Sequence, residues 1–262
     1  MLKRLVLRII DVIHRMKIKF YFESNMKYIL ETLNERCIIS VSRFKEKSWH
    51  NGYCYFRGIY KGKEVFIKVD LKLRLLENEF FFYEFLDKKL AKYLTPMYDF
   101  HQNKHLQMIV FSFISNSHEL NKYNIIGNNT YLDEIIYILD EIHKANVIHR
   151  DIKLDNFMLD DKKIKIIDFT FARNINNSSN SKFKELNISD EENYQILKRL
   201  GNGLNPKVFV WNDFISMKNI IDDILHDEKL NLDEKERLKK YSKSLATKSV
   251  DKSYEAKECL NR

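Results

Sequence analysis

The chain has 262 residues, of which 45 are Lys or Arg and 37 are Asp or Glu, so its formal net charge is +8. Hydrophobic residues make up 44% of it and aromatic residues 13%, which excludes an intrinsically disordered chain and provides for a hydrophobic core. Its 6 Gly and 2 Pro argue against a turn-rich β-sandwich. Cys37, Cys54 and Cys259 form neither a disulfide framework nor a metal-binding pair, and we therefore expect a cytoplasmic environment.

The first 40 residues predict one or two helices, which we interpret as a basic amphipathic extension. Apolar residues recur at helical spacing from Leu2 to Phe20, and basic residues lie on the other face. Two interpretations remain open. The helix packs on the protein's own body, or residues 1–20 lie on the inner face of an anionic membrane. No run of 18 apolar residues occurs, so we expect no membrane-spanning helix.

From residue 41 the pattern becomes that of strands. Residues 53–60 and 64–69 are short runs rich in β-branched and aromatic residues, and the three residues between them predict a hairpin turn. Residues 71–90 contain no Gly or Pro and predict a helix, and residues 106–114 predict a buried strand. We interpret residues 41–115 as a strand-rich first lobe.

The rest of the chain predicts mainly helices. Residues 131–145 and 211–226 carry helical apolar patterns, and two short strands are expected at 157–159 and 163–167. A Ser- and Asn-rich loop is expected at 174–190. We interpret residues 116–226 as the second lobe and residues 227–262, which mix both signs of charge, as a solvated helix and tail. This order of elements predicts an α+β protein in two lobes.

One segment carries most of the chemistry. Residues 147–156 read VIHRDIKLDN and residues 166–170 read IIDFT, so HRDxKxxN is followed by DFT. This pattern resembles the catalytic loop and the metal-binding motif of the protein-kinase-like superfamily. The resemblance implies a small antiparallel-sheet N-lobe followed by a reduced helical C-lobe.

The resemblance implies a role for each residue of this segment. Asp151 would orient the attacking hydroxyl and accept its proton, and Lys153 would stabilise charge on the transferred phosphate. Asn156 and Asp168 would hold Mg²⁺ through oxygen atoms, which this ion prefers. ATP and Mg²⁺ are therefore the expected cofactors.

Three further residues are expected to support the loop. In the family, the histidine at the position of His149 packs under the metal motif, and the arginine at that of Arg150 braces the segment that follows. Asp213, in the sequence WNDFIS, resembles the aspartate that anchors the catalytic loop from the start of the central helix. An aspartate at this place also suits a helix N-cap.

Upstream, the sequence VFIK ending at Lys68 resembles the VAIK strand, so Lys68 is predicted to hold the α- and β-phosphates of ATP. Glu79 on the following helix is predicted to be its ion-pair partner, in preference to Glu77 and Glu84. Residues 109–115 resemble the hinge that holds adenine.

The chain departs from the family pattern in three places. The glycine-rich phosphate loop is missing, and Gly52 alone stands near its expected position, where we expect backbone amides to cover the phosphates. DFG has become DFT, and Thr170 disfavours large rearrangements of the motif. No APE motif follows.

These features predict a kinase that moves the γ-phosphate of ATP to a hydroxyl group. HRDxK with Lys153 favours a Ser/Thr hydroxyl of a protein. In its missing glycine-rich loop and its reduced C-lobe, the chain is similar to lipopolysaccharide core heptose kinases. An envelope glycan is therefore the alternative acceptor. A catalytically inactive pseudokinase is a third hypothesis. We expect no nucleic-acid partner, because no basic–aromatic motif accompanies the net charge.

Overall fold

The computed structural model describes residues 2–71, 76–115, 117–161, 163–174, 204–205, 210–251 and 254–255. The chain forms two compact units, the first from residues 1–80 and 96–114 and the second from residues 81–95 and 115–262. The strands of a large antiparallel sheet belong to the first unit. Most helices of the second unit come after these strands in the chain. The predicted α+β, kinase-like fold class is therefore confirmed. Among the described residues, no helix has the length and apolar character needed to cross a membrane.

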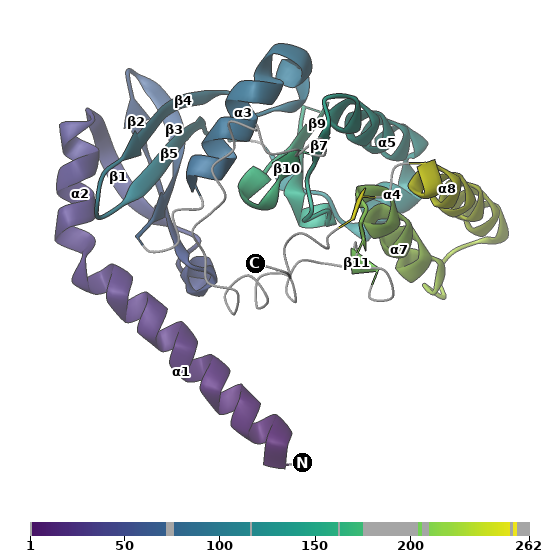
Figure 1. The fold of residues 1–262 in the computed structure, drawn as a ribbon, viewed down its shortest axis with the longest axis horizontal. Coiled ribbons are helices and arrows are strands. Elements are labelled where there is room, and N and C mark those ends of the chain that lie inside the picture. Colours follow the sequence, from purple (N-terminus) through teal and green to yellow (C-terminus); the bar gives the residue numbers. More distant parts are fainter. Residues whose placement is uncertain are drawn as a thin grey trace. The chain divides into compact units, whose positions relative to one another are not determined.

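A five-stranded antiparallel sheet forms the centre of the first unit (Figure 1), with the strands in the order β1-β2-β3-β5-β4. The predicted hairpin between β2 and β3 is present, and its two turn residues, Lys61 and Gly62, both have positive φ. Two of the strands, β1 and β4, lie where the sequence pattern predicts none. The bounds are β1 Ile38–Phe44, β2 Tyr53–Tyr60, β3 Lys63–Asp70, β4 Met97–Gln102 and β5 Gln107–Ser112.

A glycine allows β1 to join the sheet. The register of β1 against β2 shifts between Ile39 and Ser42. Directly beside this irregularity, a Cβ added at Gly58 would lie 2.9 Å from Ile38 Cγ2 and 3.2 Å from the carbonyl oxygen of Ile39. Glycine at this position of β2 therefore permits the close approach of the two strands.

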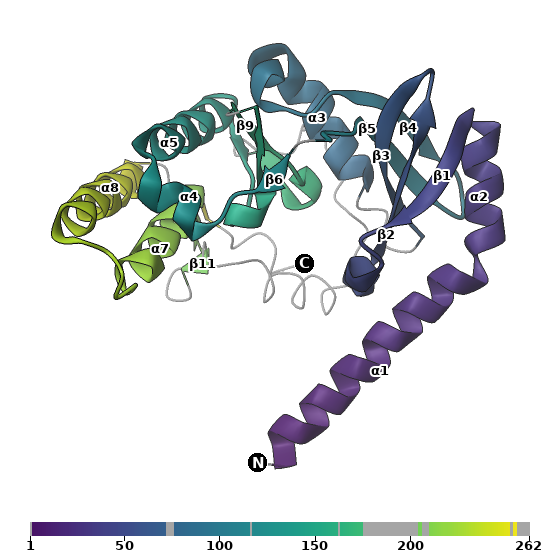
Figure 2. The same ribbon diagram turned by 180° about the vertical axis from the view of Figure 1, so that it is seen from behind.

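Two helices at the N-terminus belong to the first unit, α1 (Leu2–Ser24) and α2 (Met26–Glu35). Phe22 from α1 and Ile29 and Leu33 from α2 are buried in the same core cluster as Phe56 and Ile67 of the sheet. The end of α1 and all of α2 lie beside the sheet in both views (Figures 1 and 2). This part of the predicted N-terminal extension is thus integrated into the first unit.

The second unit contains the predicted helices at 131–145 and 211–226, within a few residues of their expected bounds. Its strands are short, and β8 and β9 form the expected pair. The predicted loop at 174–190 lies outside the described residues, apart from Asn174. The helices are the C-terminal part of α3 (Leu76–Leu90), α4 (Lys122–Gly127), α5 (Asn129–Lys144), α7 (Asp213–Leu225) and α8 (Leu232–Asp251). The strands are β6 (His118–Glu119), β7 (Val147–Ile148), β8 (Phe157–Asp160), β9 (Lys163–Ile166), β10 (Arg173–Asn174), β11 (Leu204–Asn205), β12 (Val210–Trp211) and β13 (Tyr254–Glu255).

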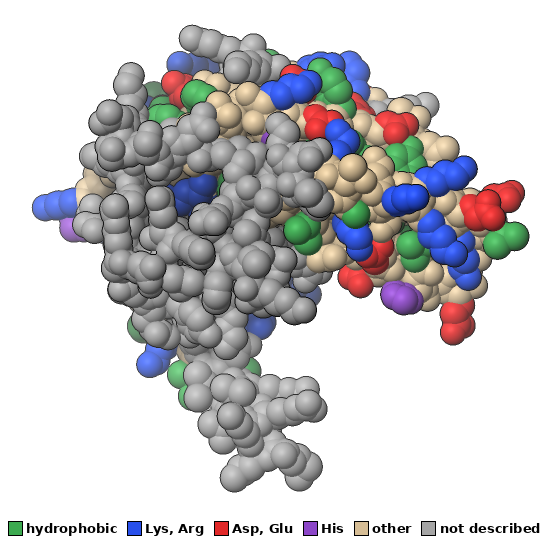
Figure 3. Space-filling view, turned by 45° about the vertical axis from the view of Figure 1, so that its right-hand side comes forward, with side chains coloured by type: hydrophobic (Ala, Val, Ile, Leu, Met, Phe, Trp, Pro, Cys, Tyr) green, Lys and Arg blue, Asp and Glu red, His purple; other side chains and the backbone are tan. Residues whose placement is uncertain are grey.

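Helix α8 packs on the second unit and keeps a charged outer surface. Its residues Leu238 and Leu245 are fully buried. Arg237 donates to the carbonyl oxygens of Ile125 and Ile126, and Lys248 pairs with Asp140 of α5 at 2.6 Å. Lys, Arg, Asp and Glu side chains are interspersed over the coloured part of the face in Figure 3, which is typical of a solvated surface.

Candidate active site

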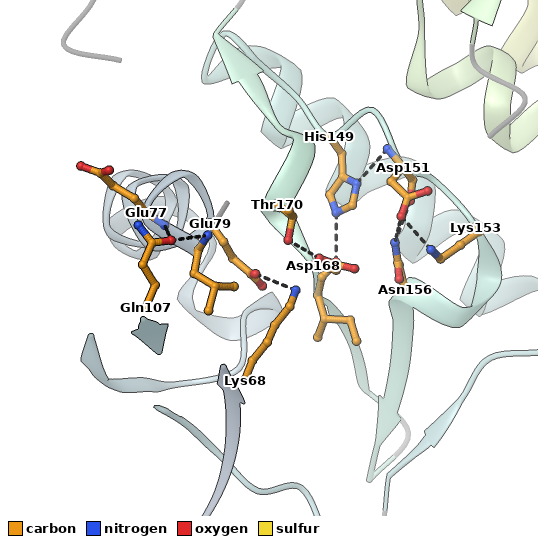
Figure 4. Close-up of polar contacts among 12 residues, drawn as sticks. Lys68, Glu77, Glu79, Gln107, His149, Asp151, Lys153, Asn156, Asp168 and Thr170 are labelled. Carbon is orange, nitrogen blue, oxygen red and sulfur yellow. Dashed lines mark hydrogen bonds and ion pairs between the residues drawn. The ribbon is translucent and has the colours of Figure 1, made fainter. Parts of the chain in front are cut away.

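In the first unit, β3 and α3 bring Lys68 and Glu79 together. Lys68 Nζ lies 2.8 Å from Glu79 Oε2, and both residues are buried, with 5% and 2% exposure. The predicted ion pair is therefore present. Figure 4 shows the side chain of Glu77 pointing away from Lys68, and Glu84 is exposed. Because water does not solvate either charge of a buried pair, each charge depends on contact with the other. This contact holds the ammonium group of Lys68 in a defined position.

A glutamine that the sequence analysis did not single out fastens the start of α3. Gln107 on β5 accepts hydrogen bonds through Oε1 from the backbone N–H groups of Leu76 and Glu77, at 3.1 and 3.3 Å (Figure 4). These first amides of a helix have no partner within the helix, so a side-chain acceptor caps them. The cap fixes the helical turn from which Glu79 reaches Lys68.

The connection between β1 and β2 stands where a glycine-rich loop is expected. It forms a short 3-10 helix, Glu46–Asn51, which ends at Gly52 with φ 99°. The ring of Trp49 is fully buried between Phe22 and Phe56, and its Nε1 donates to the carbonyl oxygen of Phe44 at 3.0 Å. This connection is therefore anchored in the core, in contrast to an open loop with three glycines. Gly52 directly precedes β2, on which Tyr53 contacts Lys68.

In the second unit, the predicted catalytic loop places two side chains against the carboxylate of Asp151. Lys153 Nζ lies 2.7 Å and Asn156 Nδ2 lies 3.0 Å from Asp151 Oδ2, and Asn156 Nδ2 also donates to the carbonyl oxygen of Asp151. Asp151 and Asn156 are buried, whereas the side chain of Lys153 is 48% exposed. The arrangement fixes the Asp151 carboxylate, and the lysine beside it remains accessible (Figure 4).

His149 connects this loop with the metal motif. The backbone N–H of Asp151 donates to His149 Nδ1 at 3.3 Å, and His149 Nε2 lies 3.0 Å from the carbonyl oxygen of Ile167. Since Nδ1 accepts and a carbonyl oxygen cannot donate, Nε2 carries the proton. The ring also contacts Phe169 edge-on at 4.7 Å, so His149 packs against the residue after Asp168.

Asp213 fastens the loop from α7. Its carboxylate accepts hydrogen bonds from the backbone N–H groups of His149 and Arg150 at 2.8 and 2.9 Å, and it lies 3.0 Å from His143 Nε2. Burial acts to raise the pKa of Asp213, but the bond with His143, the nearby imidazoles and the backbone amide outweigh it and hold the pKa below its ordinary value. The N-cap of α7 is Asn212 instead, whose side chain accepts from the amides of Phe214 and Ile215.

The metal motif has its own internal hydrogen bond. Thr170 is fully buried, and its Oγ1 donates to Asp168 Oδ1 at 2.6 Å (Figure 4). Asp168 has φ 67°, whereas Thr170 lies in a 3-10 turn, a conformation that suits a β-branched residue better than positive φ. Phe169 is buried between His149 and Tyr83, which it contacts edge-on. Threonine thus fits this position without strain.

The donor set in the second unit suits Mg²⁺. Asn156 directs its amide N–H₂ group to Asp151, so its carbonyl oxygen remains as a neutral ligand. Each carboxylate oxygen has two lone pairs, so Asp168 keeps acceptor capacity beside its bond with Thr170. In the described part of the chain, no group of three or more His, Cys, Asp or Glu is arranged so that it could hold a metal ion. One carboxylate and one amide oxygen, completed by substrate phosphates and water, are typical of Mg²⁺ sites.

Some functional positions could not be found from the sequence. Gln107 and His143 are 31 and 70 residues away along the chain from Leu76 and Asp213, which they contact, so no local pattern identifies them. The predicted hinge at 109–115 includes the end of β5 and the point, after Ile114, where the chain passes from the first unit to the second. The segment that Arg150 is expected to brace lies outside the described residues.

Comparisons with known proteins agree with this geometry. The model of the protein kinase domain family matches residues 77–193. The chain is 25% identical over 193 residues to serine/threonine-protein kinase PKH3 of Saccharomyces cerevisiae, which covers 64% of the chain and 22% of that protein. It is 26% identical over 144 residues to probable serine/threonine-protein kinase 2 of Plasmodium falciparum, covering 50% and 28%. Over 90 residues it is 29% identical to the cAMP-dependent protein kinase catalytic subunit of Dictyostelium discoideum, covering 32% and 14%.

The chain spans less than a third of the length of these relatives. The matched region nevertheless includes the fastened catalytic loop, the metal motif and Glu79. The two units and the site geometry agree with the family match. The match over residues 77–193 and the similarity to these kinases support a relationship of the chain to the protein-kinase-like superfamily.

Proposed function

We propose that this chain is an ATP- and Mg²⁺-dependent kinase that phosphorylates Ser or Thr hydroxyl groups of a protein. The observation that carries the proposal is the fixed carboxylate of Asp151, which Lys153 and Asn156 contact on a loop held by Asp213. Phosphoryl transfer depends mainly on positioning and on neutralisation of charge, and this arrangement supplies both. The names of the three relatives support a protein acceptor.

Two side chains act on the acceptor and the transferred group in this proposal. Asp151 is positioned to accept a hydrogen bond from the acceptor hydroxyl and to take its proton. Lys153 carries three N–H donors, of which one contacts Asp151, so the others can contact phosphate oxygens. Its partial exposure is compatible with an acceptor that arrives from solvent.

The remaining residues hold the nucleotide. Lys68 directs one N–H to Glu79, and its buried ammonium group is proposed to bind the α- and β-phosphates. The backbone at Gly52 is proposed to cover the phosphates. Asn156 and Asp168 would hold Mg²⁺, which when bound supplies positive charge next to the phosphate oxygens.

The test is phosphate transfer by the purified full chain. The protein is incubated with γ-labelled ATP, Mg²⁺ and a mixture of protein acceptors, and in parallel with a glycolipid fraction. We expect label on Ser or Thr of a protein. Asp151→Ala should lower the rate by about 10²–10⁴-fold, the usual contribution of a general base. Asp168→Asn should abolish Mg²⁺-dependent turnover. Asp223→Asn, an exposed position on α7, is the matched control and should leave the rate unchanged.

The other outcomes discriminate between the hypotheses. Label in the glycolipid fraction alone would contradict a protein acceptor and favour the lipopolysaccharide core sugar, which otherwise stays a prediction. Nucleotide binding without transfer to either fraction would favour an inactive pseudokinase. Transfer by Asp151→Ala at the rate of the unmodified chain would remove Asp151 from its proposed role.

A further inference from the structure

Helix α1 carries an exposed apolar stripe. Val12, Ile13, Met16 and Phe20 have exposures of 53%, 47%, 67% and 74%. At 3.6 residues per turn these four positions fall within an arc of about 100° around the helix axis. The opposite side of α1 carries Ile18 and Phe22, which pack against the core of the first unit. The exposed stripe therefore faces away from the core cluster that Ile18 and Phe22 contact.

Positive charge is concentrated around this stripe. Exposed lysines flank it, Lys17 on one side and Lys19 on the other, and residues 12–22 contain no acidic residue. The first 20 residues hold six basic residues and one acidic residue, so they contribute +5 to the net charge of +8. The excess of positive charge in this chain is thus largely a property of α1.

We propose that α1 is a docking surface for an anionic lipid bilayer. Its apolar stripe, with Met16 and Phe20, would enter the boundary between headgroups and acyl chains, and the flanking lysines would contact the headgroups. A helix with a broad apolar face between basic flanks binds in this way. In the sequence the same spacing continues towards the N-terminus with Leu2, Leu5 and Ile9.

The distribution of charge favours a bilayer over a second copy of the chain. Two α1 helices paired through their stripes would bring the lysines of both together, and residues 12–22 offer no carboxylate to pair with them. An anionic surface satisfies both flanks at once. The N-terminal half of α1 also lies clear of the sheet and of α2 in both ribbon views (Figures 1 and 2).

The test is cosedimentation of the full chain with vesicles. We expect binding to equimolar phosphatidylglycerol and phosphatidylcholine, weaker binding to phosphatidylcholine alone, and loss of binding as salt is raised. Met16→Glu with Phe20→Glu should lower the partition coefficient at least about tenfold, because two large apolar side chains leave the bilayer. The matched control, Tyr123→Glu with Leu232→Glu, changes residues of 59% and 72% exposure in the second unit and should bind normally.

A second pair of variants tests the charge. Lys17→Glu with Lys19→Glu should lower binding by about tenfold or more, whereas Lys239→Glu with Lys240→Glu, the same change of charge on exposed positions of α8, should not. A Phe20→Trp variant should show a blue shift of fluorescence on addition of anionic vesicles that exceeds the shift of the unmodified chain. Circular dichroism establishes that each variant is folded.

Three results would overturn the proposal. The first is no binding of the full chain to anionic vesicles. The second is an equal loss of binding in the variants of α1 and in the control variants. The third is a Phe20→Trp spectrum that does not respond to vesicles. A change of oligomeric state in the Met16 and Phe20 variant, with no vesicle binding by the unmodified chain, would identify the stripe as a contact between copies.

Discussion

Replacing Thr170 by valine should weaken Mg²⁺ binding while leaving the fold intact. Valine has nearly the shape of threonine, so the fully buried site keeps its packing and loses the hydroxyl donor to Asp168. A hydrogen bond to a charged group contributes about 1.5–3 kcal/mol. If this bond holds the carboxylate in its metal-binding orientation, its loss should lower the affinity for Mg²⁺ by about tenfold to one hundredfold.

The measurement is a calorimetric titration of Mg²⁺ into protein saturated with a non-hydrolysable ATP analogue. The Mg²⁺ dependence of phosphate transfer is the second readout. Thr170→Ser keeps the hydroxyl and should bind Mg²⁺ within a few-fold of the unmodified chain. Thr170→Gly restores the residue of the DFG motif but removes the donor and frees the backbone, so it should bind at least as weakly as the valine variant.

A valine variant that binds Mg²⁺ as tightly as the unmodified chain, or more tightly, would refute this reasoning. Tighter binding would mean that the Thr170 hydroxyl competes with the ion for Asp168 Oδ1 and does not position it. A serine variant as weak as the valine variant would show that the hydroxyl group is not sufficient and that the methyl group is also required.

Three further predictions concern stability. Lys68→Met should lower the free energy of unfolding of the first unit by about 3–5 kcal/mol, because it removes the positive partner of the buried Glu79 carboxylate. Lys68→Met with Glu79→Leu should recover much of this loss in denaturant titrations. Asp213→Asn should speed amide hydrogen exchange at His149. It should also make the free energy of unfolding fall less steeply as the pH is lowered. Since the pKa of Asp213 is depressed, its contribution is present above the ordinary carboxyl pKa of about 3.9 and is lost as the pH falls through the folded value. Trp49→Ala should destabilise by about 3–5 kcal/mol through loss of buried ring contacts, whereas Ser48→Ala beside it should have little effect on thermal unfolding.

Short-range patterns in the sequence predicted the elements that depend on neighbouring residues. The hairpin between β2 and β3 follows from alternating β-formers around a turn with Gly62. Helix α5 follows from apolar residues that recur every three or four positions and are buried on one side. The residues around Asp151 lie within one loop, so their types and spacing predicted a shared site before any tertiary contact was known.

Other elements depend on partners far along the chain. Strand β1 lacks a distinctive period and forms because Gly58 of β2 leaves room beside it. The anchoring of the β1–β2 connection depends on the contacts of Trp49 with Phe56 and with Phe22, and Phe22 lies too far along the chain for a local pattern to predict the contact. The resemblance to the family predicted an anchoring role for Asp213, but it did not predict the bond with His143, which lies 70 residues away.

The sequence by itself predicted the superfamily, phosphoryl-transfer chemistry and the residues of the candidate site, because phosphoryl transfer requires particular donors and carboxylates at fixed spacing within one loop. The tertiary structure decided how those residues are held. Gln107 caps the helix that carries Glu79, Asp213 fastens the catalytic loop, and Thr170 binds the carboxylate of Asp168. The tertiary structure also decided which face of α1 is buried. The physical reason is that local propensity acts between near neighbours, whereas burial depends on which distant surfaces meet.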